Sequence, residues 1–384
     1  MERAVIEIFD HLRPDVTPFI VQSEWVHDRD LPVIQELRRR KIPFSLLPDK
    51  KGWPRLGKPK SLKEFFGIVT SFLSGNFSLA KAMHGKNALY SASLYGAYFN
   101  YLAALYCRLT GKRVIHHFHD LHQHPRALRI WSWFVTDFVH NTQFGYEAIA
   151  GTHPRIRRKH NVVIPCIVDA QVSSPRDPAV LETLQGRRNL FFVGQVSRHK
   201  GIDLLLEAFG LVALSHPEAM LHIVGECPNN FREEFERLCG DCRVAGRVKY
   251  WGYRPDALYL LQSAYLYVHT SPPSRFHESF GRSVVEAMAL GVPTACFRSG
   301  ALQEIVVDRE TGLICEESPA ALADAIREML DDEGLRNRCG ERAADRYRTL
   351  YSNDPVRRRW LEFFLGVPAV DQSCAAVTTS PTRG

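Results

Sequence analysis

Two carboxylates, Glu278 and Glu286, lie at the ends of the run ESFGRSVVE, whose residue types could hold a phosphorylated ligand. Within the run, Phe280 and Gly281 precede small and apolar residues that predict a short helix, which Gly291 would end. Gly281 removes a side chain at the helix start, where the first backbone N–H groups have no intrahelical partner and favour a phosphate. Because carboxylates accept hydrogen bonds from sugar hydroxyls, a ligand that crosses this helix start could meet a carboxylate at each end.

This run resembles the E-x7-E signature of the retaining glycosyltransferases of family 4. The resemblance implies that Glu278 is catalytic and touches the donor sugar, and that Glu286 binds the ribose of the nucleotide. Phe280 and Gly281 belong to the same motif and are expected to bind the donor. Two glutamates at this spacing also occur on ordinary amphipathic helices, but the surrounding Phe280, Gly281 and Gly291 favour the motif. The family's loop of small residues near the donor phosphates is resembled by Ser299, Gly300, Ala301 and Glu304.

A second loop, upstream of this motif, carries positive charge. A strand predicted over residues 189–193 ends at Gly194, and Lys200 follows just before an amphipathic helix. The loop resembles the family's G-R-x4-K-G diphosphate loop, which implies that Gly194 and Lys200 bind the donor. Gln195 stands where the family has arginine, and we expect Arg198 to supply the missing cation.

Five histidines between residues 116 and 124 suggest a metal site as one interpretation. In a strand, only His117 and His119 would share a face, and no set of cysteines or carboxylates completes a site. The other interpretation follows from position, because His119 comes directly after a strand predicted over 113–118, and parallel sheets bind ligands at the carboxyl ends of their strands. His119 and Asp120 resemble the family's loop histidine, which points at the donor sugar. His119 is therefore expected to be the second catalytic residue, and neither a metal nor another cofactor is expected.

Strand-like and helix-like segments alternate along the chain, which predicts an α/β fold with parallel sheets. With the family resemblance, the expected fold is GT-B, two facing Rossmann-like domains. The expected boundaries are 1–170 for an N-terminal, acceptor-side domain and 171–352 for a C-terminal domain that binds the nucleotide sugar. A helix at about 353–366 is expected to pack back on the first domain, and 367–384 has the composition of a disordered tail.

The beginning of the chain is expected to follow the same alternation. A strand is predicted over residues 4–9, a helix over 31–40 and a strand over 43–47. The family's glycine-rich loop after the first strand would fall on residues 18–21, which contain no glycine.

Length and composition are those of a soluble globular protein. The chain has 384 residues, which suggests two domains, and 45% of them are hydrophobic. Nine cysteines form no regular framework, which suits a reducing compartment. The charged N-terminus is unlike a signal peptide, and no apolar run is long enough to span a membrane, so a cytoplasmic protein is expected. The net charge of +7 fits an anionic donor, and no nucleic-acid motif is present.

Six basic residues between Lys50 and Lys63 surround Trp53, and an apolar stretch at 65–73 follows. One interpretation is a peripheral contact with an anionic membrane surface, at the inner face of the membrane. The other is a solvated loop before an ordinary core helix. The sequence leaves both open.

The function expected from these features is that of a retaining glycosyltransferase, an enzyme of class EC 2.4. It would move a sugar from a nucleotide diphosphate-sugar donor to a carbohydrate or lipid-linked acceptor, in polysaccharide or glycolipid biosynthesis. The alternative is a nucleotide-sugar-binding module that has lost catalysis, which Gln195 and the missing glycine loop would explain. An oxidoreductase that binds NAD is disfavoured, because no G-x-G-x-x-G follows a predicted strand.

Overall fold

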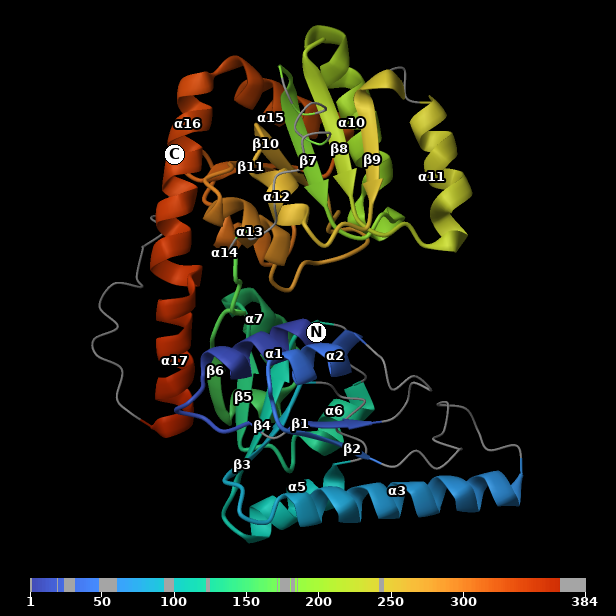
Figure 1. Cartoon of the computed structure of the whole chain (residues 1–384), viewed down its shortest axis with the longest axis vertical. Helices are drawn as coiled ribbons and strands as arrows, with labels where there is room; N and C mark the ends of the chain where they lie inside the picture. The colour runs from blue at the N-terminus through green and yellow to red at the C-terminus, as the bar shows by residue number, and fades with distance from the viewer. Residues whose placement is uncertain are drawn as a thin grey trace.

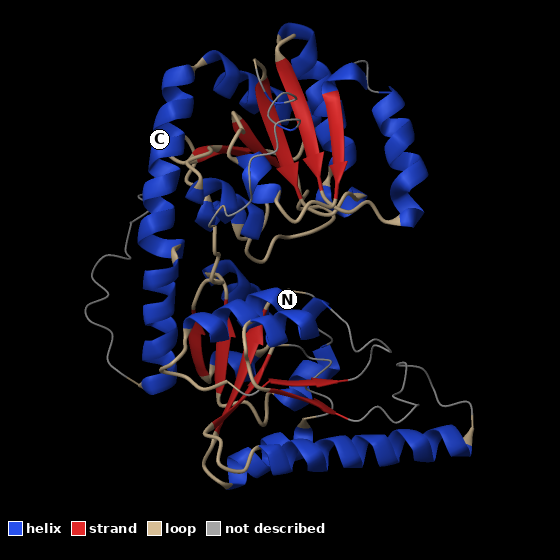
Figure 2. Cartoon of the chain, viewed as in Figure 1, coloured by secondary structure: helices blue, strands red, loops and turns tan. Residues whose placement is uncertain are grey.

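The structure, a computed structural model, describes residues 2–18, 20–23, 32–47, 61–92, 100–121, 125–170, 172, 180, 184, 186–241 and 245–366. Within these ranges, helices and strands alternate, and the strands form three sheets (Figures 1 and 2). Every pair of neighbouring strands in the three sheets runs parallel. The α/β class with parallel sheets is therefore confirmed.

The largest sheet lies in the C-terminal half and has the strand order β12-β11-β10-β7-β8-β9. Its strands are β7 (Arg188–Val193), β8 (Ala219–Val224), β9 (Val248–Gly252), β10 (Leu266–His269), β11 (Thr294–Phe297) and β12 (Gly312–Cys315). Counted along the chain, this order is that of a doubly wound sheet, and it reverses between β7 and β10. Such a reversal leaves a crevice at the carboxyl ends of the two central strands, where ligands bind.

Helices cover both faces of this sheet, because side chains alternate along each buried strand. On β7, Leu190 and Phe192 pack in one apolar cluster and Phe191 in the other. The first cluster includes side chains of α10 (Ile202–Ser215), α11 (Asn229–Asp241) and α15 (Pro319–Asp331). The second includes α12 (Ala257–Leu261), α13 (Arg282–Ala289) and α14 (Leu302–Ile305). The 3₁₀ turns η1 (Arg198–Lys200) and η2 (Ala245–Arg247) precede α10 and β9.

The sheet of the N-terminal half has the order β3-β4-β5-β6. Its strands are β3 (Ala88–Ser91), β4 (Arg113–Phe118), β5 (Asp137–His140) and β6 (His160–Val163). The cluster on one face includes side chains of α3 (Leu62–Ala82), α5 (Tyr101–Leu109), α6 (Pro125–Trp131), α7 (Gln143–Thr152) and α8 (Pro154–Arg157). A small sheet of β1 (Ile20–Ser23) and β2 (Phe44–Leu47) belongs to the same half, with α2 (Pro32–Arg39) between its strands in the sequence.

The last helices run along the side of both halves (Figure 1). After α16 (Glu333–Arg346), a π-helical turn η3 (Tyr347–Tyr351) leads into α17 (Asn353–Leu365). Trp360 of α17 is fully buried in a cluster with Ile115 of β4 and Val139 of β5. The helix α17 thus completes the second face of the N-terminal sheet.

The first helix, α1 (Glu2–His11), contacts both halves. Ile8 and Leu12 pack beside Trp360 in the N-terminal half, whereas Ala4 packs in the apolar cluster around α13. The strand predicted over residues 4–9 is therefore wrong. The helical spacing of Val5, Ile8 and Leu12 puts these side chains on one face of a helix, and a short apolar run does not distinguish a buried helix from a buried strand.

Two further expectations meet the structure near the start and at the domain boundary. Residues 20–23 form β1, so part of the region expected to be a loop after the first strand is itself a strand, paired with β2. The boundary near residue 170 stays a prediction, because much of 171–185 lies outside the described residues. The tail 367–384 and the basic loop with Trp53 also lie outside them. Among the helices that the structure describes, none combines the length and apolar character needed to cross a membrane.

Candidate functional site

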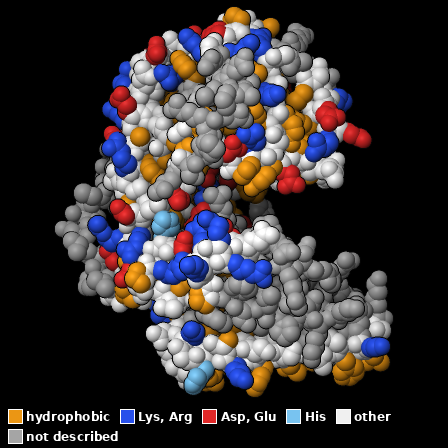
Figure 3. Space-filling model, viewed as in Figure 1, with side chains coloured by type: hydrophobic (Ala, Val, Ile, Leu, Met, Phe, Trp, Pro, Cys, Tyr) orange, Lys and Arg blue, Asp and Glu red, His pale blue; other side chains and the backbone are white. Residues whose placement is uncertain are grey.

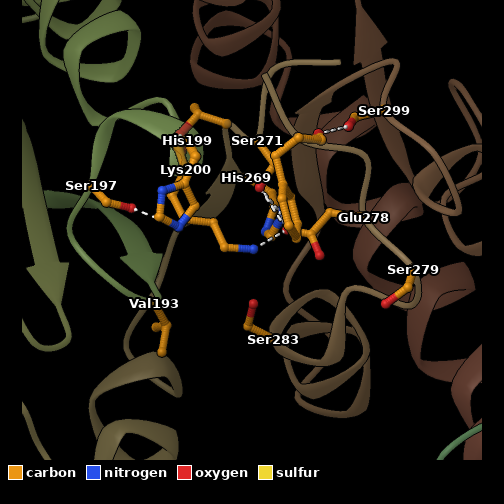
Figure 4. A network of polar contacts seen from close by, with 12 residues as sticks. Val193, Ser197, His199, Lys200, His269, Ser271, Glu278, Ser279, Ser283 and Ser299 are labelled. Carbon is orange, nitrogen blue, oxygen red and sulfur yellow. Dashed lines mark hydrogen bonds and ion pairs between the residues drawn. The ribbon is translucent and has the colours of Figure 1, made fainter. Parts of the chain in front are cut away.

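The strand order of the C-terminal sheet brings two predicted site residues together. Lys200 follows β7 and Glu278 follows β10, the neighbouring strands between which the order reverses. Lys200 Nζ donates a hydrogen bond to Glu278 Oε1, and Figure 4 shows this pair at the centre of a polar network. The pair occupies the position at which doubly wound sheets bind ligands.

Glu278 is buried, with 6% of its surface exposed, yet one of its carboxylate oxygens has three hydrogen-bond donors. Its Oε1 atom accepts hydrogen bonds from Ser271 Oγ at 2.6 Å and from His269 Nε2 at 3.0 Å, in addition to Lys200. Burial alone would raise the pKa of the Glu278 carboxyl. The hydrogen bond from His269 and the Lys200 ammonium outweigh burial and hold the pKa well below its ordinary value. Glu278 is therefore ionised at neutral pH.

Sequence reasoning missed His269 and Ser271. Both stand at the carboxyl end of β10, and a buried strand that ends in polar residues is a signal that could have singled them out. His269 is itself held by Tyr267, whose hydroxyl lies 3.3 Å from Nδ1 and donates to Ser283 Oγ at 2.7 Å. Tyr267 and His269 thus connect the start of α13 to Glu278.

Glycines position the backbone on both sides of Glu278. Gly281 is the N-cap of α13 with φ of +73°, and a Cβ there would lie 2.7 Å from Leu302 Cδ2. Gly300 has φ of +53°, and a Cβ there would lie 2.3 Å from the Glu278 carbonyl oxygen. Both positions therefore require glycine for backbone conformation and close packing. The glycine at 281 lets the helix begin at this point, which is a different reason from the ligand access expected from sequence.

Glu286 lies one helical turn after Arg282, and the two side chains form an ion pair. Arg282 Nε donates to Glu286 Oε1 at 3.1 Å, and Arg282 Nη1 lies 2.8 Å from Glu7 Oε2. Glu7 belongs to α1 and is 1% exposed. Glu286, the residue predicted to bind ribose, is therefore held by Arg282, which also contacts α1.

The remaining predicted donor residues lie outside the Lys200–Glu278 pair. The Arg198 guanidinium donates to Glu234 of α11 and lies 3.4 Å from Asp203, so it is directed toward acidic side chains. Phe280 is 5% exposed and its ring packs against Tyr351, which gives the side chain a packing role. Gly194 directly follows β7, and its N–H donates to Val224 O at 2.9 Å.

His119 follows β4 at the end of the N-terminal sheet that faces the other half. Burial lowers its pKa to about 3, so the imidazole is neutral. Its Nε2 is buried and has no hydrogen-bond partner among the described residues. The backbone of His119 is tied to the C-terminal half, because Ser279 Oγ donates to His119 O at 2.8 Å. Ser279 is the residue after Glu278, so the two predicted catalytic residues belong to connected loops.

Further contacts join the same edges of the two halves. Thr142 Oγ1 donates to Ser279 O at 2.9 Å. The Glu304 carboxylate accepts hydrogen bonds from the N–H groups of Gln143, at 2.9 Å, and of Phe144, at the first turn of α7. A carboxylate of the C-terminal half therefore caps a helix of the N-terminal half.

His116 and His117, two of the five histidines between residues 116 and 124, pack in the interior. His117 Nε2 lies 2.6 Å from Asn141 Oδ1 and its Nδ1 contacts Tyr90, while His116 Nδ1 accepts from Trp131 Nε1 at 3.1 Å. Within the described parts of the chain, no group of three or more histidine, cysteine or acidic side chains could hold a metal ion. His122 and His124 lie outside those parts.

Known proteins are similar to this chain in two respects: solved structures share its fold, and a family model matches its C-terminal half. The structure is similar to a glycosyltransferase from Rickettsia africae (TM-score 0.78, 18% identity, covering 95% of this chain and 94% of that one). It is also similar to Anabaena Alr3699/HepE in complex with UDP and glucose (TM-score 0.75, 17% identity, covering 95% and 96%). The chain therefore has the GT-B fold, as the sequence predicted.

Residues 173–346 match the family described as Glycosyl transferases group 1, so the C-terminal half contains a domain of that family. Among curated relatives, a D-inositol 3-phosphate glycosyltransferase of Corynebacterium kroppenstedtii is 29% identical over 240 residues, 58% of this chain and 52% of the relative. The lipopolysaccharide core biosynthesis glycosyltransferase LpsE of Rhizobium meliloti is 27% identical over 193 residues, 50% of this chain and 54% of the relative. The chain thus spans about half the length of these relatives.

Proposed function

We propose that this chain is a glycosyltransferase that takes a sugar from a nucleotide diphosphate donor and transfers it with retention of anomeric configuration. The observation that carries the proposal is the buried, ionised Glu278 paired with Lys200 at the point where the strand order reverses. An anion and a cation held side by side suit a reaction in which a sugar gains positive charge while a diphosphate leaves.

Different residues of the crevice would stabilise the negative charge of the leaving diphosphate and the positive charge of the sugar. The Lys200 ammonium and the first N–H groups of α13 would stabilise the departing diphosphate, while Glu278 would stabilise the positive charge at the anomeric carbon. Neutral His119, with its Nε2 buried and unpaired among the described residues, would donate to or accept from a sugar hydroxyl. Glu286 would bind the ribose after exchanging part of its contact with Arg282. No step in this scheme uses a metal.

The donor and the acceptor are proposed from different observations. Alr3699/HepE binds UDP and glucose, and a nucleotide diphosphate-sugar is proposed as the donor here as well. The relatives named for inositol phosphate and for lipopolysaccharide core support a carbohydrate or a lipid-linked acceptor. We propose that this protein works in the cytoplasm, in polysaccharide or glycolipid biosynthesis.

The test compares sugar transfer and nucleotide binding in the purified protein with EDTA present. Glu278→Gln and His119→Ala should lower the rate constant by roughly 10²- to 10³-fold, because a well-placed electrostatic contact contributes about 2.7 to 4 kcal/mol in the transition state. Nucleotide affinity should change little in both. The exposed Glu316→Gln is the control for loss of a carboxylate and should keep the parent rate.

Two outcomes would contradict the proposal. Full activity of Glu278→Gln at saturating donor would remove Glu278 from the reacting sugar. Binding of nucleotide sugars without hydrolysis or transfer would favour the alternative, a binding module that has lost catalysis. Glu286→Ala separates binding from chemistry, since loss of a charge-assisted hydrogen bond to ribose should weaken nucleotide affinity by about 1.5 to 3 kcal/mol.

A further inference from the structure

A stripe of apolar side chains faces solvent along α3. Leu62, Phe66, Leu73 and Phe77 are between 50% and 77% exposed. At about 100° per residue, these positions fall within about 60° of one another around the helix, so they form one continuous stripe. A helix that packs only against the core normally has polar residues on its solvent-exposed side.

The stripe continues onto α5, which packs beside α3. Asn76 Oδ1 of α3 accepts a hydrogen bond from the Leu102 N–H at 2.9 Å, so α5 begins next to Phe77. Leu102, Leu105 and Leu109 of α5 are 39%, 42% and 79% exposed. We call the exposed apolar residues of the two helices the α3–α5 face: Leu62, Phe66, Leu73, Phe77, Leu102, Leu105 and Leu109. Contiguous exposed apolar patches of this kind mark interaction sites in soluble proteins.

Positive side chains border the α3–α5 face. Lys63 and Lys81 are exposed at the same edge of the α3 stripe. At the end of α5, Arg108 is exposed. Lys159, whose ammonium donates to Val135 O, and Arg155 lie near it; burial first, and then the charges of Arg108 and Arg155, lower the pKa of Lys159 to about 8. The Arg155 guanidinium lies 3.3 Å from the centre of the Trp133 ring, which is itself exposed.

The face lies at one end of the molecule. Figure 1 shows α3 and α5 at the end of the N-terminal half that points away from the C-terminal half. Figure 3 shows hydrophobic side chains interspersed with lysine and arginine along this lower edge. A flat partner bound there would leave the crevice between the halves open.

We propose that the α3–α5 face docks on the surface of a bilayer that contains anionic lipid. Apolar side chains on one side of a helix enter the headgroup region, and basic side chains at its border are attracted to negatively charged headgroups. A second copy of this chain fits less well, because it would bring the two sets of cations against each other. The docking goes beyond the proposed function by naming the surface on which the protein would work. It does not depend on that function, since vesicle binding is measurable whether or not sugar is transferred.

The test is flotation of the full chain with vesicles of roughly equal parts phosphatidylglycerol and phosphatidylcholine. The parent should float with these vesicles at low salt, and much less at high salt or with pure phosphatidylcholine. The double variant Leu73→Ser/Phe77→Ser should bind about tenfold more weakly, because it removes apolar area from the docked face. The matched control Leu211→Ser/Leu214→Ser alters exposed leucines of α10 in the other half and should float like the parent.

A second variant keeps the test valid if the first one unfolds. Lys63→Glu/Lys81→Glu leaves the apolar residues in place, and it should reduce flotation while keeping the parent's thermal midpoint. Equal binding of the parent to neutral vesicles, or parent-like binding by a folded Leu73→Ser/Phe77→Ser variant, would overturn the proposal. A parent that fails to float and is a dimer by light scattering would show that a second copy covers the face. Transfer to a water-soluble acceptor should be unchanged in both variants, which separates this inference from the proposed function.

Discussion

Glu278 keeps its charge inside the protein because three donors converge on one of its oxygens. Its pKa in the folded protein lies well below the ordinary 4.5, although burial acts in the opposite direction. The ionised form therefore contributes stability that is complete above pH 4.5 and is lost as the pH falls toward the folded-state pKa. We predict that the difference in free energy of unfolding between the parent and Glu278→Gln is largest near neutral pH and shrinks below about pH 4.5.

Urea unfolding between neutral and mildly acidic pH measures this difference. Glu316→Gln serves as the control, since its exposed ion pair with Arg298 should contribute little at any pH. A difference for Glu278→Gln that stays constant down to the acid limit of folding would mean that the carboxyl titrates normally. The pairing with Lys200 would then be absent in solution.

At the level of single elements, the start of α13 depends on glycine. Gly281→Ala should destabilise the protein by about 1 to 3 kcal/mol, because the residue has φ of +73° and the added methyl group would approach Leu302 Cδ2 at 2.7 Å. Gly210→Ala is the matched control, since Gly210 lies inside α10 with open space around it and alanine should stabilise by about 0.4 to 1 kcal/mol. Denaturant unfolding of both variants measures the contrast. Equal effects of the two substitutions would show that α13 does not begin as described.

Elements and site residues were predictable from sequence to different degrees. The bounds predicted for β4, residues 113–118, agree with the structure, because a run of buried β-formers lies between turn residues. The sequence predicts a strand where the structure has the helix α1, since the apolar side chains of α1 pack against α17, which is distant in the sequence. Likewise, the motifs placed Lys200 and Glu278 correctly in separate loops. Their pairing follows only from the strand order, which no local pattern contains.

For the molecule as a whole, Glu304 is one of the contacts that hold the two halves at their present angle. Glu304→Ala removes both hydrogen bonds to the first turn of α7, and loss of such a cap typically costs about 0.5 to 2 kcal/mol. We predict a larger radius of gyration by small-angle X-ray scattering, because the halves can then separate more often. Glu317→Ala is the control: its carboxylate accepts from Ser274 within the C-terminal half, so the radius should not change. An unchanged radius for Glu304→Ala would mean that other contacts are sufficient to keep the halves together.

Trp360 must be synthesised before the core of the N-terminal half can be completed during translation. This side chain fills the core beside Ile115 and Val139, so the N-terminal sheet lacks part of one covering layer until α17 has been synthesised. The two apolar clusters of the C-terminal sheet contain no residue that follows η3. Their few contributions from the N-terminal half, such as Ala4 and Cys166, are synthesised early. The N-terminal half leaves the ribosome before the C-terminal half and must therefore wait for α17. During that interval its apolar surface is exposed to chaperones and to other nascent chains.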